Sequence, residues 1–262
     1  MRNLTNDEIK NIQLDILRNY ASYCEKNGLT YYLAYGTLIG AVRHHGYIPW
    51  DDDIDVIMPR PDYERFIREY RDERYKVFCP EFNKDCPCTY GKLYDSNTVL
   101  KELSSRKYDI GLNIDIFILD GLPRDIVKAQ KHIKKCSFWI NILDVKKIAF
   151  RKERSFLRNL KLLILKSLVF LLPYRTIRNK IISLNKKYDF MSSSFCSDMC
   201  YTGALHLPKE VFGIGKKMLF EDREYTAPEN YGFWLKGVYG DYMQLPPVEK
   251  RISHHVFKAF WK

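Results

Sequence analysis

Apolar residues near the N-terminus repeat with helical spacing. Ile9, Ile12 and Ile16 lie three or four positions apart, which predicts an amphipathic helix over residues 6–26. Thr5, with a glutamate three positions later, is typical of a capping box at the start of such a helix. We therefore expect the chain to open with one long helix that packs its isoleucine face on a core.

Further along, short apolar and aromatic runs alternate with helical patterns and with Pro and Gly breaks, which predicts a mixture of strands and helices. A chain of 262 residues with 46% hydrophobic content can bury a sizeable core. Residues 125–187 are predicted to be mostly helical, and loop signals dominate after about residue 196. The expected strands are 30–35, 53–58, 75–79, 98–102 and 111–119, and the expected helices after the first are 38–44 and 61–70.

Positive charge gathers in one part of the chain. The net charge is +11, but residues 126–187 hold 17 Lys and Arg against two acidic side chains, a local charge of +15. The remaining 200 residues hold 26 basic and 30 acidic side chains, so they are mildly acidic. This asymmetry predicts a basic helical insert that faces an anionic partner. No nucleic-acid-binding motif accompanies the charge, so we expect no nucleic acid partner.

An apolar segment inside this insert allows two interpretations. Residues 156–174 are rich in leucine, but Arg158, Lys161 and Lys166 interrupt them. Their uncharged run, 167–174, is far shorter than the roughly 20 residues that a membrane span needs. The segment is either a helix buried in the protein or an interfacial helix on anionic lipid, which the surrounding positive charge favours.

Four aspartates lie within the five positions from 51 to 55. Asp51, Asp53 and Asp55 share one parity, so in an extended strand their carboxylates point to one face and repel unless a cation lies between them. Oxygen-only ligands favour Mg²⁺ or Mn²⁺ over zinc. A calcium loop of the EF-hand kind fails, because Val56 stands where that loop needs glycine and Asp62 where it needs glutamate.

A Gly-Thr pair precedes these aspartates. A glycine turn that leads into a helix leaves backbone N–H groups free for an anion, so Gly36 and Thr37 are candidate phosphate-binding residues. Arg43 follows, and a guanidinium can grip a diphosphate through two hydrogen bonds. Together with Asp53 and Asp55, the pair resembles the Gly-Ser or Gly-Thr plus Asp-x-Asp signature of nucleotidyltransferases.

The same region resembles the LicD family, which is related to the fukutin-related proteins. The family pattern reads here as GTLIG at residues 36–40, then Arg43, then IPWDDDID at residues 48–55. The resemblance touches most of the chain except about residues 125–195. Further similar blocks are residues 114–117 with Asp120, residues 220–223, 239–242 and 245–247, Arg251 and His254.

The resemblance implies a mixed α+β fold, with a nucleotidyltransferase-like core sheet and flanking helices. It implies that Mg²⁺ or Mn²⁺ is held by Asp53, Asp55 and Asp115, with Asp115 also helping to deprotonate an acceptor hydroxyl. The implied reaction moves a phospho-alcohol, such as phosphocholine, from a CDP-activated donor to a glycan hydroxyl, and CMP leaves. The acceptor is a cell-surface glycan such as lipopolysaccharide, teichoic acid or capsule, or its lipid-linked precursor. The expected substrate-binding residues are Gly36, Thr37, Arg43, His44, Asp51, Lys92, Asp241, Arg251 and His254.

Two other functions stay open. A true nucleotidyltransferase uses a similar acidic site but leaves a whole nucleotide on its substrate, and a non-catalytic protein would only bind a membrane surface. In the enzyme interpretation, the chain divides into a catalytic core at 1–124, the basic insert at 125–195 and a C-terminal part at 196–262 that completes the active site.

The cysteines bear on the compartment. Seven cysteines without a repeating framework, together with a polar N-terminus, predict reduced thiols and a cytoplasmic protein, peripheral on the inner face of the plasma membrane. A zinc site is the alternative use of the thiols, although the tight Cys-x-x-Cys pairs of structural sites are absent from the sequence. Its ligands would be Cys79, Cys86 and Cys88 with Cys196 or Cys200.

Overall fold

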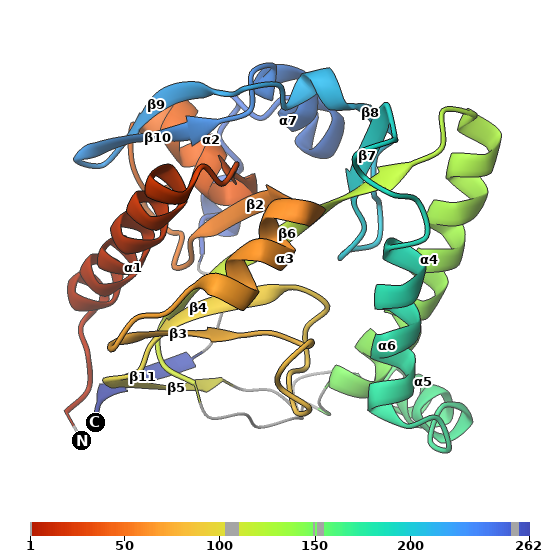
Figure 1. Ribbon diagram of the computed structural model, residues 1–262. Coiled ribbons are helices and arrows are strands. Elements are labelled where there is room, and N and C mark those ends of the chain that lie inside the picture. Colours follow the sequence, from red (N-terminus) through yellow and green to blue (C-terminus); the bar gives the residue numbers. More distant parts are fainter. Residues whose placement is uncertain (1, 103–109, 149, 151–154, 253–256) are drawn as a thin grey trace.

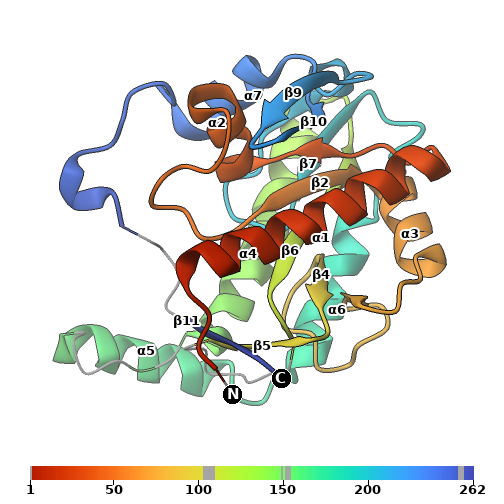
Figure 2. The ribbon, with the colours of Figure 1, turned by 90° about the vertical axis from the view of Figure 1, so that its left-hand side faces the viewer.

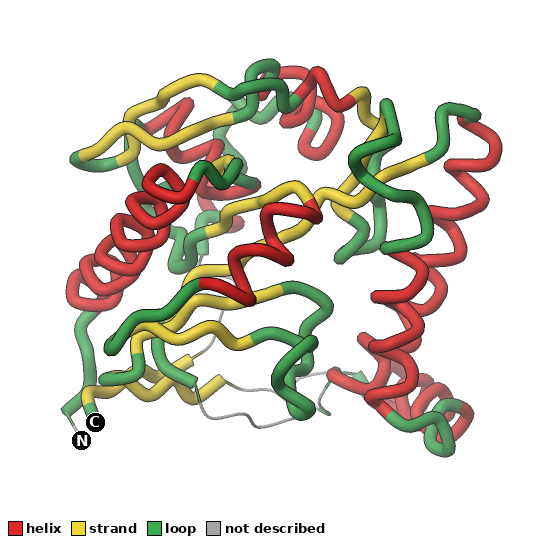
Figure 3. The backbone as a smooth tube through the Cα atoms, in the orientation of Figure 1, coloured by secondary structure: helices red, strands yellow, loops and turns green. Residues whose placement is uncertain are grey.

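The computed structural model describes residues 2–102, 110–148, 150, 155–252 and 257–262. A seven-stranded mixed sheet forms its centre, and helices lie around it (Figure 1), so the predicted α+β class is confirmed. Figure 3 shows strands through the middle of the molecule, with a further strand pair along the top and another at the bottom near the termini. The strands of this sheet are β1 (Tyr32–Leu33), β2 (Asp55–Pro59), β3 (Tyr75–Phe78), β4 (Gly91–Asp95), β6 (Asn113–Leu122), β7 (Phe195–Asp198) and β8 (Leu207–Pro208).

The order of the sheet is β1-β2-β6-β4-β3, and β7 and β8 extend it from the far end of β6. The central strands β2 and β6 run parallel, with Asp55 beside Asp115. On the other side of β6, the antiparallel strand β4 brings Lys92 opposite Asp115. Three charged residues therefore lie in one row across three adjacent strands.

Two helices cover one face of this sheet. Helix α1 (Asn6–Asn27) begins with the predicted capping box, in which Thr5 accepts from the backbone of Glu8 and the Glu8 side chain accepts from the backbone of Thr5. Its isoleucine face is buried, as predicted. Helix α3 (Arg60–Glu69) packs on β2 and β6, while α1 packs on β4 and β6 (Figures 1 and 2). Because both helices pack on this face of the sheet, they help to hold β2 in place beside β6.

A second group of elements closes the top of the molecule in Figure 1. Helix α2 packs on β2 and on strand β9 of a separate two-stranded sheet, and α7 contacts the turn η1. At the opposite end, β11 pairs with β5 beside the two termini (Figure 2). The bounds are α2 (Tyr35–His44), β9 (Lys216–Phe220), β10 (Arg223–Ala227), α7 (Tyr231–Tyr239), η1 (Lys209–Val211), η2 (Val248–Lys250), β5 (Thr98–Glu102) and β11 (Phe257–Trp261).

The basic insert is helical, as its pattern predicts. Helix α4 packs on α6 and on α5, and the three stand to one side of the sheet in Figure 1. Leu122 at the end of β6 packs with Cys136 and Leu184 and so joins this group to the sheet. Within the described residues, no helix is both long enough and apolar enough to cross a bilayer. The bounds are α4 (Ile126–Lys147), α5 (Phe156–Leu168) and α6 (Tyr174–Asn185).

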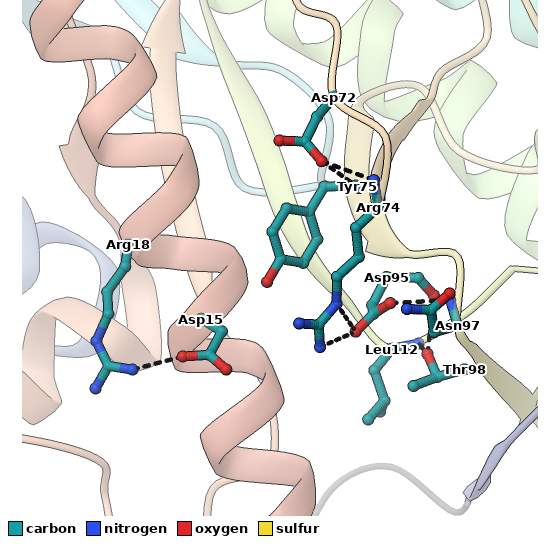
Figure 4. Close-up of polar contacts among 9 residues, drawn as sticks. All are labelled: Asp15, Arg18, Asp72, Arg74, Tyr75, Asp95, Asn97, Thr98 and Leu112. Atoms are coloured by element: carbon teal, nitrogen blue, oxygen red, sulfur yellow. Dashed lines mark hydrogen bonds and ion pairs between the residues drawn. The ribbon is translucent and has the colours of Figure 1, made fainter.

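The hairpin β3–β4 is fixed by a polar network (Figure 4). Asp95 is fully buried and accepts hydrogen bonds from the Arg74 guanidinium at 2.7 and 3.0 Å and from the backbone N–H of Asn97 at 2.9 Å. Asp72 accepts from the backbone N–H groups of Arg74 and Tyr75. Because buried carboxylates are costly without such donors, this network holds β4, and with it the charged row, in register against β6.

Several predicted boundaries are wrong, for identifiable reasons. The strand expected at 53–58 begins at Asp55, so Asp51–Asp53 lie in a loop and the shared parity of the aspartates does not apply. The strand expected at 30–35 is only β1, because Tyr35, with φ of 45°, turns the chain directly into α2. Strand β4 was not predicted, since its sequence, with Gly91, Lys92 and Asp95 around two apolar residues, has no clear apolar pattern. The strands after residue 195 were also not predicted, because the glycines and prolines in that part of the sequence indicate loops.

Candidate active site

The charged row is the starting point of the site. Asp55 is the first residue of β2 and Asp115 the third of β6, and the Asp115 N–H donates to the Ile54 carbonyl at 2.9 Å. Lys92 Nζ donates to Asp115 Oδ1 at 2.5 Å and to Asn113 Oδ1 at 3.1 Å. The fold thus brings together three residues that the sequence marks as candidates, from positions more than 20 residues apart.

The surroundings of Asp55 disfavour the charged form of its carboxyl group. Burial raises its pKa well above the ordinary value, and the charges of Asp53, Asp115 and Asp51 raise it further, whereas Lys92 lowers it only in part. A buried carboxylate among three others is stable as an anion only when positive charge is supplied. A cation that binds among these oxygens would supply it, so this arrangement fits a metal ion.

The loop before β2 adds a tight acidic cluster. Oxygens from Asp51, Asp52 and Asp53 all lie within 4.8 Å of one another. Gln13 Nε2 donates to the Asp52 carbonyl at 2.9 Å and ties this loop to α1. Among the described residues, no other group of three His, Cys, Asp or Glu side chains meets this spacing. The expected ligand set of Asp53, Asp55 and Asp115 therefore shares only Asp53 with the cluster.

The spacing of possible metal ligands also tests the predicted zinc alternative. All seven cysteines are free and buried, and none belongs to such a ligand group in the part of the chain that the structure describes. Cys79 packs in the main core, whereas Cys86 and Cys88 pack with Phe78 and Ile110 in a separate cluster. These thiols act as small apolar side chains, and the oxygen-only donors of the acidic loop match a hard cation instead.

The Gly-Thr pair supports the aspartates. It lies in the first turn of α2, where the Thr37 hydroxyl accepts the backbone N–H of Asp55 at 2.8 Å. Thr37 is buried, so its direct role is to hold the start of β2. At Gly36, an added Cβ would lie 2.5 Å from Asp51 Oδ2. The glycine leaves the space that this carboxylate occupies.

Gly36→Ala is therefore expected to displace the acidic loop. We expect kcat/KM for the activity proposed below to fall on the order of 10–100-fold, because small misplacements of reacting groups are costly. Gly232→Ala on α7 is the matched control, since its new Cβ would meet only Tyr242 Oη at 3.4 Å. Steady-state rates and melting curves of both variants check this. Equal rates for the two variants would contradict the role of Gly36.

A cavity of about 540 Å³ opens beside the acidic loop. Its lining is carboxylate-rich at Asp51, Asp53 and Asp55, and aromatic elsewhere. Asp53 also lines a small cavity of about 50 Å³ that holds Lys92 and Asp115. Asp53 of the acidic loop therefore lines both cavities. Further lining residues of the large cavity are Tyr35, Gly36, Trp50, Asp198, Tyr201, Trp234 and Tyr239.

Basic side chains gather around Trp50, which lines the large cavity. Arg43 donates to His44 Nε2 at 2.9 Å and to the Tyr242 carbonyl at 2.8 Å. The Arg251 guanidinium lies over the Trp50 ring at 5.5 Å. Burial lowers the pKa of His44, and the charge of Arg43 lowers it further, so the neutral imidazole is favoured. These three predicted residues therefore lie together near Trp50, although none of them lines either cavity.

Two other predicted residues are placed differently. Asp241 is exposed in the loop after α7 and does not line either cavity, although Tyr239, from the same sequence block, does. His254 lies outside the described residues. Tyr239 lines the large cavity together with Asp51, Asp53 and Asp55. Burial raises the pKa of Tyr239, and the charges of these three aspartates raise it further.

Sequence reasoning missed much of the cavity lining. The missed residues include Tyr35, Asp198, Tyr201 and Trp234, which come from α2, β7, the loop after β7 and α7. No motif groups them, and the chain has 38 aromatic residues among which to choose. Only the pairing of β7 with β6 brings this part of the chain to the site.

The sheet and the two carboxylates of its charged row, which we call the acidic row, define the class of this protein. Carboxylates near the start of neighbouring parallel strands are the arrangement of a nucleotidyltransferase-like fold. Residues 28–163 match the family model described as LicD/FKTN/FKRP, nucleotidyltransferase domain. The chain belongs to the LicD family.

Curated relatives agree with this assignment. The chain is 31% identical over 274 aligned positions to the lipopolysaccharide cholinephosphotransferase LicD of Haemophilus influenzae, with 99% of both chains covered. An uncharacterized protein of Rickettsia typhi is 36% identical over 55 residues, which cover 20% of this chain and 18% of that protein. One of Rickettsia prowazekii is 58% identical over 31 residues, or 12% of each chain. Similarity to the Haemophilus protein thus includes the insert and the C-terminal part.

Proposed function

We propose that this protein transfers phosphocholine from CDP-choline to a hydroxyl of a cell-surface glycan or its lipid-linked precursor. The observation that carries the proposal is the acidic row at the cavity, Asp55 beside Asp115 with Asp53 between the two cavities. End-to-end similarity to a lipopolysaccharide cholinephosphotransferase supports the transferred group and the class of acceptor.

The proposed step is an in-line displacement at phosphorus. The acceptor oxygen bonds to the phosphorus that carries choline, and the bond from that phosphorus to the bridging oxygen breaks, so that CMP leaves with the bonding electrons. Asp115, held by Lys92 Nζ, accepts the hydroxyl proton. Lys92 also offsets negative charge near the transferring group. Arg43 and Arg251, which lie near Trp50 of the cavity lining, are proposed to bind the diphosphate.

We also propose a divalent cation, Mg²⁺ or Mn²⁺, among the oxygens of Asp53 and Asp55, with Asp51 or Asp115 completing the set. When bound, it supplies Lewis-acid stabilisation of the donor's phosphate oxygens. The raised pKa of Asp55 supports this assignment, because a cation removes the cause of that shift. The proposed cation is tested by Mn²⁺ titration of the chelator-treated protein, followed by electron paramagnetic resonance. No difference in Mn²⁺ binding between wild type and Asp53→Asn would remove this site.

Product mass tests the reaction itself. The protein is incubated with CDP-choline, Mg²⁺ and a delipidated glycan acceptor, and the mass of the acceptor is then measured by mass spectrometry. Gain of one phosphocholine, with CMP released, is the expected result. Gain of a whole cytidylyl group would instead establish a nucleotidyltransferase. Absence of any product, together with no heat on titration with CDP-choline and Mg²⁺, would favour a protein that only binds.

We further propose that the basic insert binds an anionic membrane surface, where a lipid-linked acceptor would be found. The alternative of a buried helix is wrong, because only Leu162 of α5 is buried. Leu157 and Leu168 are each 75% exposed, and Leu171, just beyond the helix, is 87% exposed. Lysines and arginines surround this apolar face, which matches an interfacial helix on acidic lipid.

Replacing Leu157, Leu168 and Leu171 by serine is expected to weaken vesicle binding by at least about tenfold, because each leucine loses the burial of its apolar surface. Sedimentation with vesicles of phosphatidylcholine, with and without phosphatidylglycerol, measures this. Ile214→Ser is the matched control, since Ile214 is 91% exposed on a different part of the chain. Equal, negligible pelleting of the wild type with both vesicles would remove the proposal.

A further inference from the structure

Part of the large cavity's lining is built from aromatic rings. Tyr35 lies at its centre, with ring centroids 5.7 Å from Tyr201 and 5.4 Å from Trp234. Phe117 supports both tyrosines from the sheet, at 5.2 and 5.1 Å. Tyr201 is 43% exposed, so its ring is open to a ligand, whereas Trp234 is anchored in the core. Aromatic faces attract cations through their quadrupoles.

A buried carboxylate backs these rings. Asp198 at the end of β7 is 7% exposed and lines the cavity. Its Oδ2 accepts from the Tyr35 hydroxyl at 2.5 Å and its Oδ1 from the Cys200 backbone N–H at 2.8 Å. Within the described ranges of the chain, no Lys, Arg or His forms an ion pair with it. A buried negative charge without a cationic partner is costly, and a cationic ligand would offset that cost.

These rings share one cavity with the acidic residues. Tyr201 and Asp198 line it together with Asp53 and Asp55. A ligand whose phosphate is held near Asp55 would place its other end against Tyr201 and Asp198.

We propose that Asp198, Tyr35, Tyr201 and Trp234 form the subsite for the trimethylammonium group of the donor, which would make them the residues that select choline. This inference rests on the proposed function, because it assigns one end of the proposed donor. A quaternary ammonium needs ring faces and a nearby negative charge but no hydrogen-bond acceptor.

The aromatic lining around Asp198 disfavours other head groups. Both of its oxygens already accept hydrogen bonds from the protein. A primary ammonium needs three acceptors, and a polyol needs donors and acceptors for each hydroxyl. The aromatic lining supplies few of these, so CDP-ethanolamine and CDP-glycerol would leave polar groups unsatisfied on binding.

The test compares donors across matched variants. Calorimetric titration with Mg²⁺ present is expected to show the wild type binding CDP-choline on the order of 10–100-fold more tightly than CDP-glycerol. Asp198→Asn and Tyr201→Leu are expected to reduce CDP-choline affinity by roughly tenfold while CDP-glycerol affinity stays the same. Tyr201→Phe, which keeps the ring face, is expected to retain most of the preference. Equal losses for both donors, or no loss for CDP-choline, would overturn the subsite.

Folding of the variants is checked separately. Burial raises the pKa of Asp198 to about 6, so at pH 8 the folded protein carries a charge that it disfavours. Asp198→Asn removes that charge and is expected to melt no lower than the wild type at pH 8. A lost binding preference in a variant that melts normally is then an effect on the ligand and not on the fold.

A second ligand separates this inference from the proposed function. Tetramethylammonium chloride carries the head group without the nucleotide, and its binding is followed by tryptophan fluorescence, because Trp234 lines the subsite. If tetramethylammonium binds in a way that depends on Asp198 while no CDP compound binds, the proposed donor is contradicted but the subsite is supported. Binding of CDP-choline that is indifferent to Asp198 and Tyr201 would sink the subsite alone.

Discussion

Asp55→Asn is expected to lower kcat for phosphocholine transfer on the order of 10²–10³-fold, since it removes a charge that is positioned before the reaction begins. Asp55 is the buried member of the acidic row, and its backbone is fixed by Thr37 and by the pairing of β2 with β6. The carboxamide keeps the shape of the side chain but not its charge. Initial rates at saturating CDP-choline measure the effect.

The same substitution is expected to leave the fold intact or to stabilise it. Burial and three neighbouring carboxylates raise the pKa of Asp55, so its charged form opposes folding at neutral pH. An Asn variant with an unchanged or higher melting temperature and a large loss of kcat would separate catalysis from stability. Glu224→Gln, on an exposed strand position, is the control for a lost carboxylate elsewhere. Wild-type turnover by Asp55→Asn would remove Asp55 from the proposed mechanism.

The sequence predicted the parts of the site that lie close together along the chain. The apolar residues after Asp55 and around Asp115 predict two buried strands, and the structure makes them parallel neighbours in register. Lys92 was singled out, although the strand that carries it was not. Its contact with Asp115 follows only from the antiparallel pairing of β4 with β6.

Other parts of the site depend on long-range packing. Asp198 and Trp234 reach the cavity because β7 pairs with β6 and because α7 packs near α2, and no local pattern encodes either contact. The strand was expected to begin at Asp53, and the shared parity of Asp51, Asp53 and Asp55 was interpreted as that of an extended chain, but Asp51–Asp53 lie in a loop. The Asp52 carbonyl of that loop accepts a hydrogen bond from Gln13 of α1, and the Asp51 side chain lies beside Gly36 of α2.

The largest loss of stability is expected at the pair between α3 and β6. Arg60 Nε and Nη2 each donate to one oxygen of Asp120 at 2.7 Å, and the two side chains are only 9% and 1% exposed. Breaking a buried pair from one side leaves an uncompensated charge, so Asp120→Ala is expected to reduce the free energy of unfolding by about 3–5 kcal/mol. Urea denaturation followed by circular dichroism measures it.

A double-mutant cycle shows whether the loss arises from the broken pair or from the missing side chain. Arg60→Met with Asp120→Leu removes both charges and keeps similar volume, so the double variant is expected to be more stable than either single variant. Burial lowers the pKa of Arg60 while Asp120 raises it, and burial raises the pKa of Asp120 while Arg60 lowers it, so burial and pairing oppose each other at both groups. Additive losses would mean that each side chain acts on its own. A strongly non-additive cycle would show that the pair holds α3 against β6, and thereby holds the strand that begins at Asp55 in the position the acidic row requires.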